Sequence, residues 1–160
     1  FIGFHLAIYL TELGYEVTGI DNNIRGGEKS AMNFLLRQNI KYLNCDLCNQ
    51  YEIRDKCTEV LVKCDYIYHL AAFNGTQNFY NVPYKVIRNS SLPTINLVDF
   101  LVENNLSPKI LYTGSSESYS ESVNRNLIDI PTNEEALVSL GDLKNPRWSY
   151  ACAKTYGEYV

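Results

Sequence analysis

A tyrosine and a lysine near the carboxyl end of the chain have the spacing of an acid–base pair. In Tyr150-Ala151-Cys152-Ala153-Lys154 the two side chains share one face if the segment is helical. The positive charge of the lysine can lower the pKa of the phenol, which makes tyrosine a usable base near neutral pH. Because the chain contains 13 tyrosines, a chance pair at this spacing is also expected.

A serine-rich turn supplies further groups that can move protons. Thr113-Gly114-Ser115-Ser116-Glu117 directly follows an apolar run that we interpret as a buried strand. Hydroxyl groups and a carboxylate at the end of a strand suit hydrogen bonding to a substrate and proton transfer. The alternative is a polar loop without chemistry, since serine clusters are common in loops.

Two features near the amino end suit a bound dinucleotide. Phe1-Ile2-Gly3 opens a predicted helix, whose free N–H groups and dipole favour a phosphate. Asp21 ends a predicted strand, where its carboxylate can accept hydrogen bonds from both ribose hydroxyls of an adenosine and repel a 2′-phosphate, which favours NAD over NADP. The alternatives are an ordinary glycine turn and an acidic turn at Asp21-Asn22-Asn23.

Alternating helix and strand patterns position these groups. Helices are predicted over Gly3–Leu13, Gly26–Gln38 and Tyr51–Lys63, within Pro83–Asn104 and from Pro146 onward, and strands over Val17–Ile20, Lys41–Cys45, Asp65–Ala72 and Lys109–Thr113. Asp65–Ala72 is expected to be fully buried, Pro93 should kink the long helix or lie in its first turn, and 114–145 is polar and irregular. The alternation predicts an α/β fold with a parallel sheet and helices on both faces.

Composition limits the class of protein. The 160 residues are 46% hydrophobic, which suits one domain with a sizeable core. A net charge of -4 gives no global basic surface, so nucleic acid is not an expected partner. No apolar run approaches the ~20 residues of a membrane span, and the start of the chain lacks the charged region of a signal peptide.

The cysteines allow two interpretations. Their odd number, scattered through apolar segments at Cys45, Cys48, Cys57, Cys64 and Cys152, favours reduced thiols in a cytoplasmic protein. Cys45 and Cys48 have C-x-x-C spacing, so a zinc site with Cys57 and Cys64 is an alternative. The wide separation of the second pair favours ordinary buried cysteines and no metal.

The order of these motifs resembles the extended short-chain dehydrogenase/reductase family, namely its NAD-dependent nucleotide-sugar epimerases and dehydratases. The resemblance covers essentially the whole chain. Phe1-Ile2-Gly3-Phe4-His5-Leu6 resembles the end of the family's G-x-x-G-x-x-G fingerprint, Ile20-Asp21-Asn22 its ribose-binding strand end, Cys45-Asp46-Leu47 its adenine-side acid and neighbour, and His69-Leu70-Ala71-Ala72 its fourth-strand motif. The chain departs from the family's usual residues at Ser90 (asparagine), Pro93 (glycine) and Ser120 (glycine).

The resemblance implies a Rossmann-type doubly wound sheet and a set of site residues. It implies cofactor contacts at Phe1, Ile2, Gly3, Asp21, Asn22, Asp46, Leu47, Leu70, Ala71, Ala72, Tyr150 and Lys154, and catalytic positions at Ser115, Glu117, Tyr150 and Lys154. Tyr150 as phenolate would take a proton from a sugar hydroxyl, with Ser115 steadying that hydrogen bond. Hydride would pass to NAD, and Lys154 would hold the nicotinamide ribose.

The resemblance also implies the setting of the chain. Residues 1–160 are expected to form one NAD-binding domain, truncated at both ends, that lacks the first strand, the first two glycines of the fingerprint and the carboxyl-terminal substrate lobe. The substrate would be a UDP-, dTDP- or GDP-sugar. A homodimer would form through the helices around 83–104 and 146–160.

Three other functions stay open. Ser116-Glu117 and Pro146-Arg147-Trp148-Ser149-Tyr150 resemble segments of UDP-glucuronate decarboxylases, although related epimerases share parts of both patterns. The role of Glu117 stays open between a second acid–base group, a helix cap and a contact to a substrate hydroxyl. A cofactor-binding sensor or scaffold without catalysis is the second alternative. A flavodoxin-like phosphate-binding module is the third, and it predicts neither Asp21 nor a Tyr-x-x-x-Lys helix.

Overall fold

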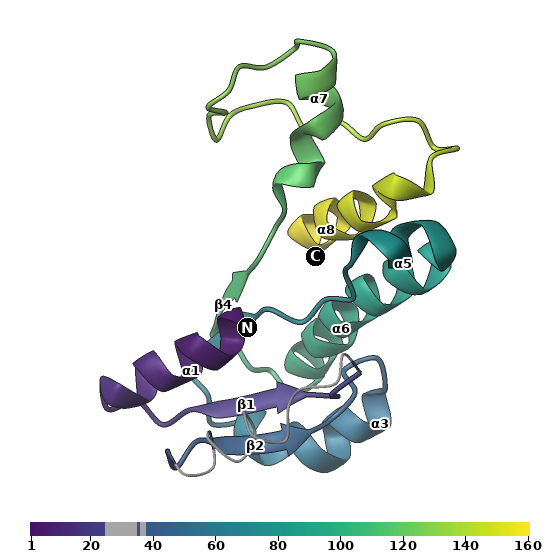
Figure 1. The fold of residues 1–160 in the computed structure, drawn as a ribbon. Helices are drawn as coiled ribbons and strands as arrows, with labels where there is room; N and C mark the ends of the chain where they lie inside the picture. The colour runs from purple at the N-terminus through teal and green to yellow at the C-terminus, as the bar shows by residue number, and fades with distance from the viewer. Residues whose placement is uncertain (25–34, 36–37) are drawn as a thin grey trace. The chain divides into compact units, whose positions relative to one another are not determined.

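The computed structural model describes residues 1–24, 35 and 38–160 (Figure 1). The chain divides into two compact units, one of residues 1–70 and 96–110 and the other of 71–95 and 111–160. The helix predicted over Gly26–Gln38 falls almost wholly on residues outside the described ranges.

The first unit begins with a helix and a parallel pair of strands. α1 (Ile2–Glu12) confirms the first predicted helix and ends before Gly14, whose φ of +89° is one that glycine adopts readily. β1 (Thr18–Asp21) pairs in parallel with β2 (Lys41–Asn44), so that Asp21 lies opposite Asn44 (Figure 1). Parallel pairing brings the carboxyl ends of both strands to the same edge, where α/β sheets bind ligands.

The helix predicted over Tyr51–Lys63 is present but not uniform. It consists of α3 (Gln50–Glu52), the π-helical turn η1 (Ile53–Cys57) and α4 (Thr58–Leu61). Asn49 caps its start by accepting a hydrogen bond from the Tyr51 N–H. Ile53 and Cys57, at the two ends of the π turn, both lie in the core.

The main core of the first unit contains two of the cysteines. Its buried members are Cys45, Ile53, Cys57, Leu61, Leu97, Phe100 and Leu101. Burial and the neighbouring Cys57 thiol raise the pKa of Cys45 to about 12, so it packs as an uncharged side chain. No group of three or more metal-ligating side chains comes together in the part of the chain that the structure describes.

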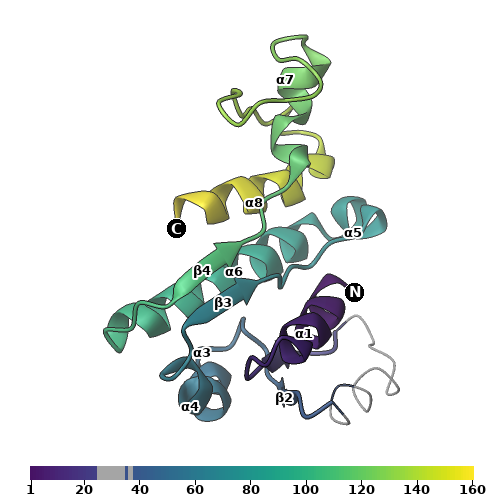
Figure 2. The same cartoon turned by 90° about the vertical axis from the view of Figure 1, so that its left-hand side faces the viewer.

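Two strands and a long helix follow. α6 (Pro83–Glu103) is one helix that starts at Pro83 and contains Pro93 in its interior, so Pro93 does not lie in the first turn. β3 (Tyr66–His69) and β4 (Lys109–Tyr112) form a second two-stranded sheet (Figure 2). The prediction that these strands are buried is wrong.

The exposure of β3 follows from the pleat of a strand. Successive side chains point to opposite faces, and the exposed Tyr66 and Tyr68 alternate with the better covered Ile67 and His69. In β4, Ile110 and Leu111 are 43% and 50% exposed. An apolar run identifies a strand, but it does not specify that both faces are covered.

The second unit contains α5 (Thr76–Asn81), η2 (Ser116–Tyr119), α7 (Ser120–Asn124), η3 (Pro146–Trp148) and α8 (Ser149–Tyr159). The last two confirm the predicted final helix. The expectation of an irregular segment over 114–145 is wrong for η2 and α7. Their serines are polar yet buried, because Ser118 accepts a hydrogen bond from Thr155 and Ser122 bonds to the Leu137 carbonyl.

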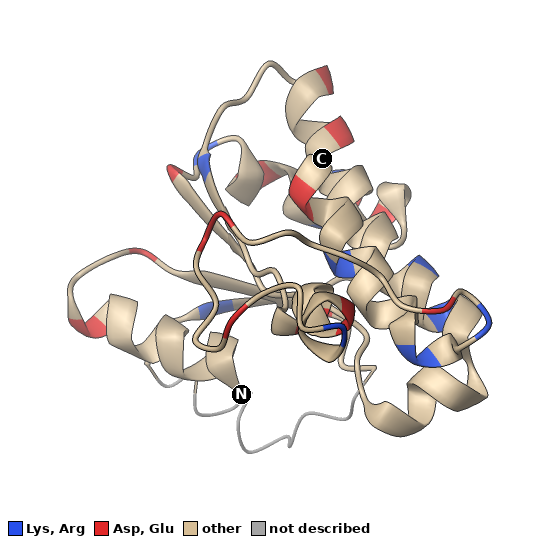
Figure 3. Cartoon of the chain, turned by 90° about the horizontal axis from the view of Figure 1, so that it is seen from above, with Lys and Arg blue, Asp and Glu red and all other residues tan. Residues whose placement is uncertain are grey.

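The described elements carry acidic and basic residues on both units (Figure 3). Among the described residues, no helix combines the length and the apolar character that crossing a membrane requires.

Candidate functional site

The second unit brings Tyr150 and Lys154 together, as the sequence predicts. Both lie on α8, and the Nζ atom of Lys154 is 5.9 Å from the centroid of the Tyr150 ring. Lys154 is only 2% exposed, and Nζ donates a hydrogen bond to the Thr113 carbonyl at 2.6 Å. Burial lowers the pKa of Lys154, and the charge of Glu158 partly opposes this shift.

A second tyrosine, Tyr112, flanks Lys154 and was not singled out from the sequence. The centroid of its ring lies 4.7 Å from Lys154 Nζ. The pKa of Tyr112 is raised to about 12, mainly by burial and to a smaller extent by electrostatic interactions with Tyr150 and Glu158. Tyr112 therefore stays a neutral phenol at pH 7. A side chain at Gly157 would collide with this ring, so the glycine makes room for it.

Ser115 and Glu117 lie at the start of η2. The Ser115 Oγ atom accepts a hydrogen bond from the Glu117 N–H at 3.3 Å and so caps the helix. This bond uses the oxygen as an acceptor, and the hydroxyl proton remains able to donate. Of the three roles considered for Glu117, the structure shows that its backbone N–H, not its carboxylate, makes the cap contact.

The carboxylate of Glu117 pairs with Arg147. Arg147 Nη1 and Nη2 donate to the two Glu117 oxygens at 3.2 and 2.8 Å. The guanidinium carbon lies 5.0 Å from the centroid of Phe79, and Phe79 stacks on Tyr150 with centroids 5.4 Å apart. The pair joins residues 30 positions apart, so no spacing rule could have found it.

The first unit places two of the predicted cofactor acids at one edge. Asp21 ends β1, and Asp46 lies two residues beyond β2, so both follow the carboxyl ends of the parallel pair. Each carboxylate organises its own turn, since Asp21 accepts from the Asn23 N–H at 2.6 Å and Asp46 from the Cys48 N–H at 2.9 Å. The Asn22 side chain accepts from the Ile24 N–H at 3.1 Å.

Asn96 fixes the backbone beside Asp46 and was not found from the sequence. Its Nδ2 donates to the Leu47 carbonyl at 2.8 Å, and its Oδ1 accepts from the Gln50 side chain at 3.2 Å. Asn96 is only 6% exposed, so its amide group is largely shielded from water. The Leu47 turn is therefore tied to α6.

The start of α1 lies beside the end of β3. Leu70 Cδ1 is 3.4 Å from the position that a β-carbon on Gly3 would occupy, which is an ordinary van der Waals contact, so the packing here does not itself require glycine. Phe1 and Ile2 are 97% and 67% exposed. Ala71 and Ala72 belong to the second unit, whereas the predicted cofactor residues from Phe1 to Leu70 belong to the first.

A hollow of about 520 Å³ lies elsewhere in the first unit. It is lined by residues 61–66 and 105–109, at the amino ends of β3 and β4. None of the predicted site residues contributes to it, and ligands of α/β sheets bind at the opposite, carboxyl ends. We therefore do not assign it to the site.

The family of the chain follows from a comparison with known proteins. The model of the NAD dependent epimerase/dehydratase family matches residues 1–160. The chain belongs to this family.

Curated relatives include decarboxylases. The chain is 27% identical over 158 residues to the UDP-N-acetyl-alpha-D-glucosaminuronate decarboxylase of Bacillus cytotoxicus, a match that covers 99% of the chain and 45% of that protein. It is 25% identical over 121 residues to UDP-glucuronic acid decarboxylase 1 of Danio rerio, covering 76% of the chain and 26% of that protein. The chain thus spans less than half the length of these relatives.

Solved structures share the fold. A UDP-galactose 4-epimerase is 26% identical, with a TM-score of 0.75 over 99% of this chain and 46% of that one. The UDP-glucose 4-epimerase of Bifidobacterium longum, solved with NAD+ and UDP, is 21% identical with a TM-score of 0.78 over 99% of this chain and 44% of that one. The chain therefore has an α/β fold of the kind found in these epimerases.

Proposed function

We propose that the protein containing this chain is an NAD-dependent nucleotide-sugar epimerase or dehydratase that acts through a transient keto sugar. The observation that carries the proposal is the buried Lys154, anchored on the Thr113 carbonyl at 2.6 Å and sharing a helix face with Tyr150. Burying an ammonium group costs free energy unless the group is paired and hydrogen-bonded. Placed near a phenol, it stabilises the phenolate that proton abstraction requires.

In the proposed reaction, residues of the second unit have different roles. Tyr150 takes the proton of a sugar hydroxyl, and Ser115 donates a hydrogen bond that orients that hydroxyl. Tyr112 is less suited to act as the base, because burial raises its pKa to about 12. When bound, NAD supplies the hydride acceptor for the sugar carbon.

The carboxyl edge of β1 and β2 fits the adenosine half of NAD. Asp21 offers a carboxylate at the end of β1, where ribose hydroxyls are bound in this class of fold. Asp46 and Leu47 lie at the same edge, held by Asn96. Gly3, Leu70, Ala71 and Ala72 are the proposed contacts along the rest of the cofactor.

A decarboxylase is the second candidate. It is favoured by two decarboxylase relatives, one of them matching 99% of the chain. The Ser116-Glu117 segment also resembles that of decarboxylases, and the Glu117 carboxylate accepts two hydrogen bonds from Arg147.

The doubly wound sheet and the dimer are also proposals. In the strand order 3-2-1-4-5, β2 and β1 would take positions 3 and 2, and β3 and β4 positions 4 and 5. For the dimer, α6 and α8 expose Tyr84 and Tyr159. Such exposed aromatic side chains suit a helical interface.

Product masses test the reaction. The complete protein is incubated with NAD and a panel of UDP-, dTDP- and GDP-sugars that includes UDP-glucuronate. A new isomer of unchanged mass indicates an epimerase, loss of water a dehydratase and loss of carbon dioxide a decarboxylase. No product from any donor, with NAD bound, would replace the proposal by a cofactor-binding sensor or scaffold.

Replacing Asp21 is expected to weaken NAD binding about tenfold and to reduce discrimination against NADP, because a charged hydrogen bond to ribose is lost. Asp21→Asn is the informative variant, since its side-chain oxygen can still accept from the Asn23 N–H and preserve the turn. Calorimetric titration with both cofactors measures the change. Unaltered cofactor preference in Asp21→Asn would show that the residue is only a turn acid.

Replacing Asn96 by alanine is expected to weaken NAD binding several-fold and to lower the free energy of unfolding by about 1–3 kcal/mol, because the Leu47 carbonyl loses its donor, the buried Asn96 side chain. Asn104→Ala is the matched control, since it removes a 2.7 Å bond to the Phe100 carbonyl at the carboxyl end of α6. Equal NAD affinity in both variants would separate the Leu47 turn from cofactor binding.

A further inference from the structure

A series of contacts links Glu117 to Tyr150 through two side chains that the proposed reaction does not otherwise use. Arg147 donates to both Glu117 oxygens, at 3.2 and 2.8 Å. Its guanidinium carbon lies 5.0 Å from the centroid of Phe79. Phe79 stacks on Tyr150, with centroids 5.4 Å apart and ring planes at 19°. The contacts connect η2 and α5 to the consecutive elements η3 and α8.

Each contact constrains orientation as well as distance. The planar fork of Arg147 matches the two carboxylate oxygens, which fixes both groups in one plane. Phe79 is 4% exposed, so its ring is held by packing. A guanidinium over an aromatic ring and two stacked rings both have preferred geometries. Displacing Arg147 therefore alters the surface on which the Tyr150 ring rests.

We propose that Arg147 is a positioning residue, which holds Glu117 as a fixed carboxylate and orients Tyr150 through Phe79. The inference rests on the proposed function, because it concerns the orientation of the proposed base. It assigns Glu117 a role by charge and position, while the proton transfer belongs to Tyr150.

Kinetics of Arg147 variants test the proposal in the complete protein. Arg147→Met keeps an unbranched apolar chain but removes the charge and the fork. We expect kcat to fall about 10- to 100-fold, since small misplacements of a catalytic group have effects of this order. KM for the nucleotide sugar and the affinity for NAD are expected to stay within about twofold. Arg147→Lys restores the charge without the fork or the planar surface, so it recovers only part of kcat.

Phe79→Leu tests the aromatic link separately. It leaves Arg147 and Glu117 in place, and we expect a similar loss of kcat. Because both variants act through the orientation of one ring, the double variant Arg147→Met/Phe79→Leu should lose little more than either single variant. Arg125→Met is the matched control, because it breaks an exposed Arg125–Glu121 pair of 2.7 Å on α7 and should leave kcat unchanged.

Several results would overturn the proposal. Positioning through Phe79 would be excluded if the losses of kcat multiply in the double variant. It would also be excluded if Arg147→Lys recovers the full kcat, or if the variants change only KM. If Arg147→Met does not fold, as judged by near-ultraviolet circular dichroism, the same cycle is run with Arg147→Lys. A wild-type protein without product would remove the proposed function and the positioning role together, whereas an active wild type with independent variants removes the positioning role alone.

Discussion

Tyr150→Phe is expected to slow oxidation of the sugar by about 10²- to 10⁴-fold, the range that a positioned general base contributes. The variant keeps the ring that stacks on Phe79 with centroids 5.4 Å apart and loses only the hydroxyl. NAD binding and the free energy of unfolding should therefore remain close to those of the wild type. Single-turnover formation of reduced cofactor, followed at 340 nm, measures the oxidation step.

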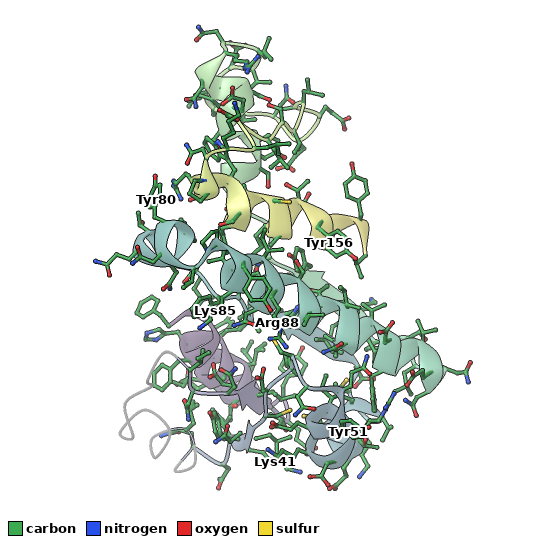
Figure 4. All side chains as sticks on the ribbon, turned by 90° about the vertical axis from the view of Figure 1, so that its right-hand side faces the viewer. Lys41, Tyr51, Tyr80, Lys85, Arg88 and Tyr156 are labelled. Atoms are coloured by element: carbon green, nitrogen blue, oxygen red, sulfur yellow. The ribbon has the colours of Figure 1, made fainter. Side chains whose placement is uncertain are left out.

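Tyr156→Phe is the control for this prediction. Tyr156 lies on the same helix, is 46% exposed (Figure 4) and should tolerate loss of its hydroxyl. Turnover of Tyr150→Phe within threefold of that of Tyr156→Phe would exclude Tyr150 as the base.

Lys154→Met is expected to reduce kcat by about 10²- to 10³-fold, the loss typical of removing one preorganised electrostatic contact. The free energy of unfolding should change much less. The variant leaves the Thr113 carbonyl without its 2.6 Å donor, which destabilises, but it also removes a buried charge, which stabilises. Lys85→Met, on the exposed side of α6, is the control for loss of a lysine (Figure 4).

Lys154→Met also has a signature in the pH dependence of stability. Burial lowers the pKa of Lys154 in the folded state below its usual 10.5. As the pH rises through this lowered pKa towards 10.5, the folded protein loses a proton that the unfolded chain keeps, so the wild type gains stability. Lys154→Met lacks this gain. The difference in free energy of unfolding between the two proteins, measured by denaturant at pH 7 and pH 10, should therefore shift in favour of the wild type. A constant difference would contradict the burial of a charged Lys154.

Local sequence rules predicted most of the fold. Helical spacing identified α1 and α8, and short apolar runs identified β1 to β4, within one to a few residues of their observed bounds. They did not predict η2 and α7, because the buried hydroxyls of Ser118 and Ser122 make a packed segment look like a polar loop. They also did not predict the exposure of Tyr66 and Leu111, because covering a strand depends on its neighbours and not on its own residues.

In the candidate site too, contacts between residues close in sequence were predicted and contacts between distant residues were not. Tyr150 and Lys154 are four residues apart, and helix geometry alone places them on one face. Arg147 and Glu117 meet across 30 residues, and Asn96 reaches Leu47 across 49. Tyr112 gains its significance from packing against Lys154 and Gly157. Contacts of this kind depend on tertiary packing, so no periodic signal in the sequence could indicate them.

In the proposed reaction, a carbon of the nucleotide sugar transfers its hydride to NAD bound by this protein. The most direct test uses a nucleotide sugar that is turned over and that carries deuterium on its ring carbons. The reaction is quenched during the first turnover with a denaturant at neutral pH. The mass of the released cofactor is then measured by mass spectrometry. We expect reduced cofactor carrying one deuterium in the wild type and none in Tyr150→Phe. Product formed while the cofactor stays oxidised and unlabelled throughout the turnover would contradict it.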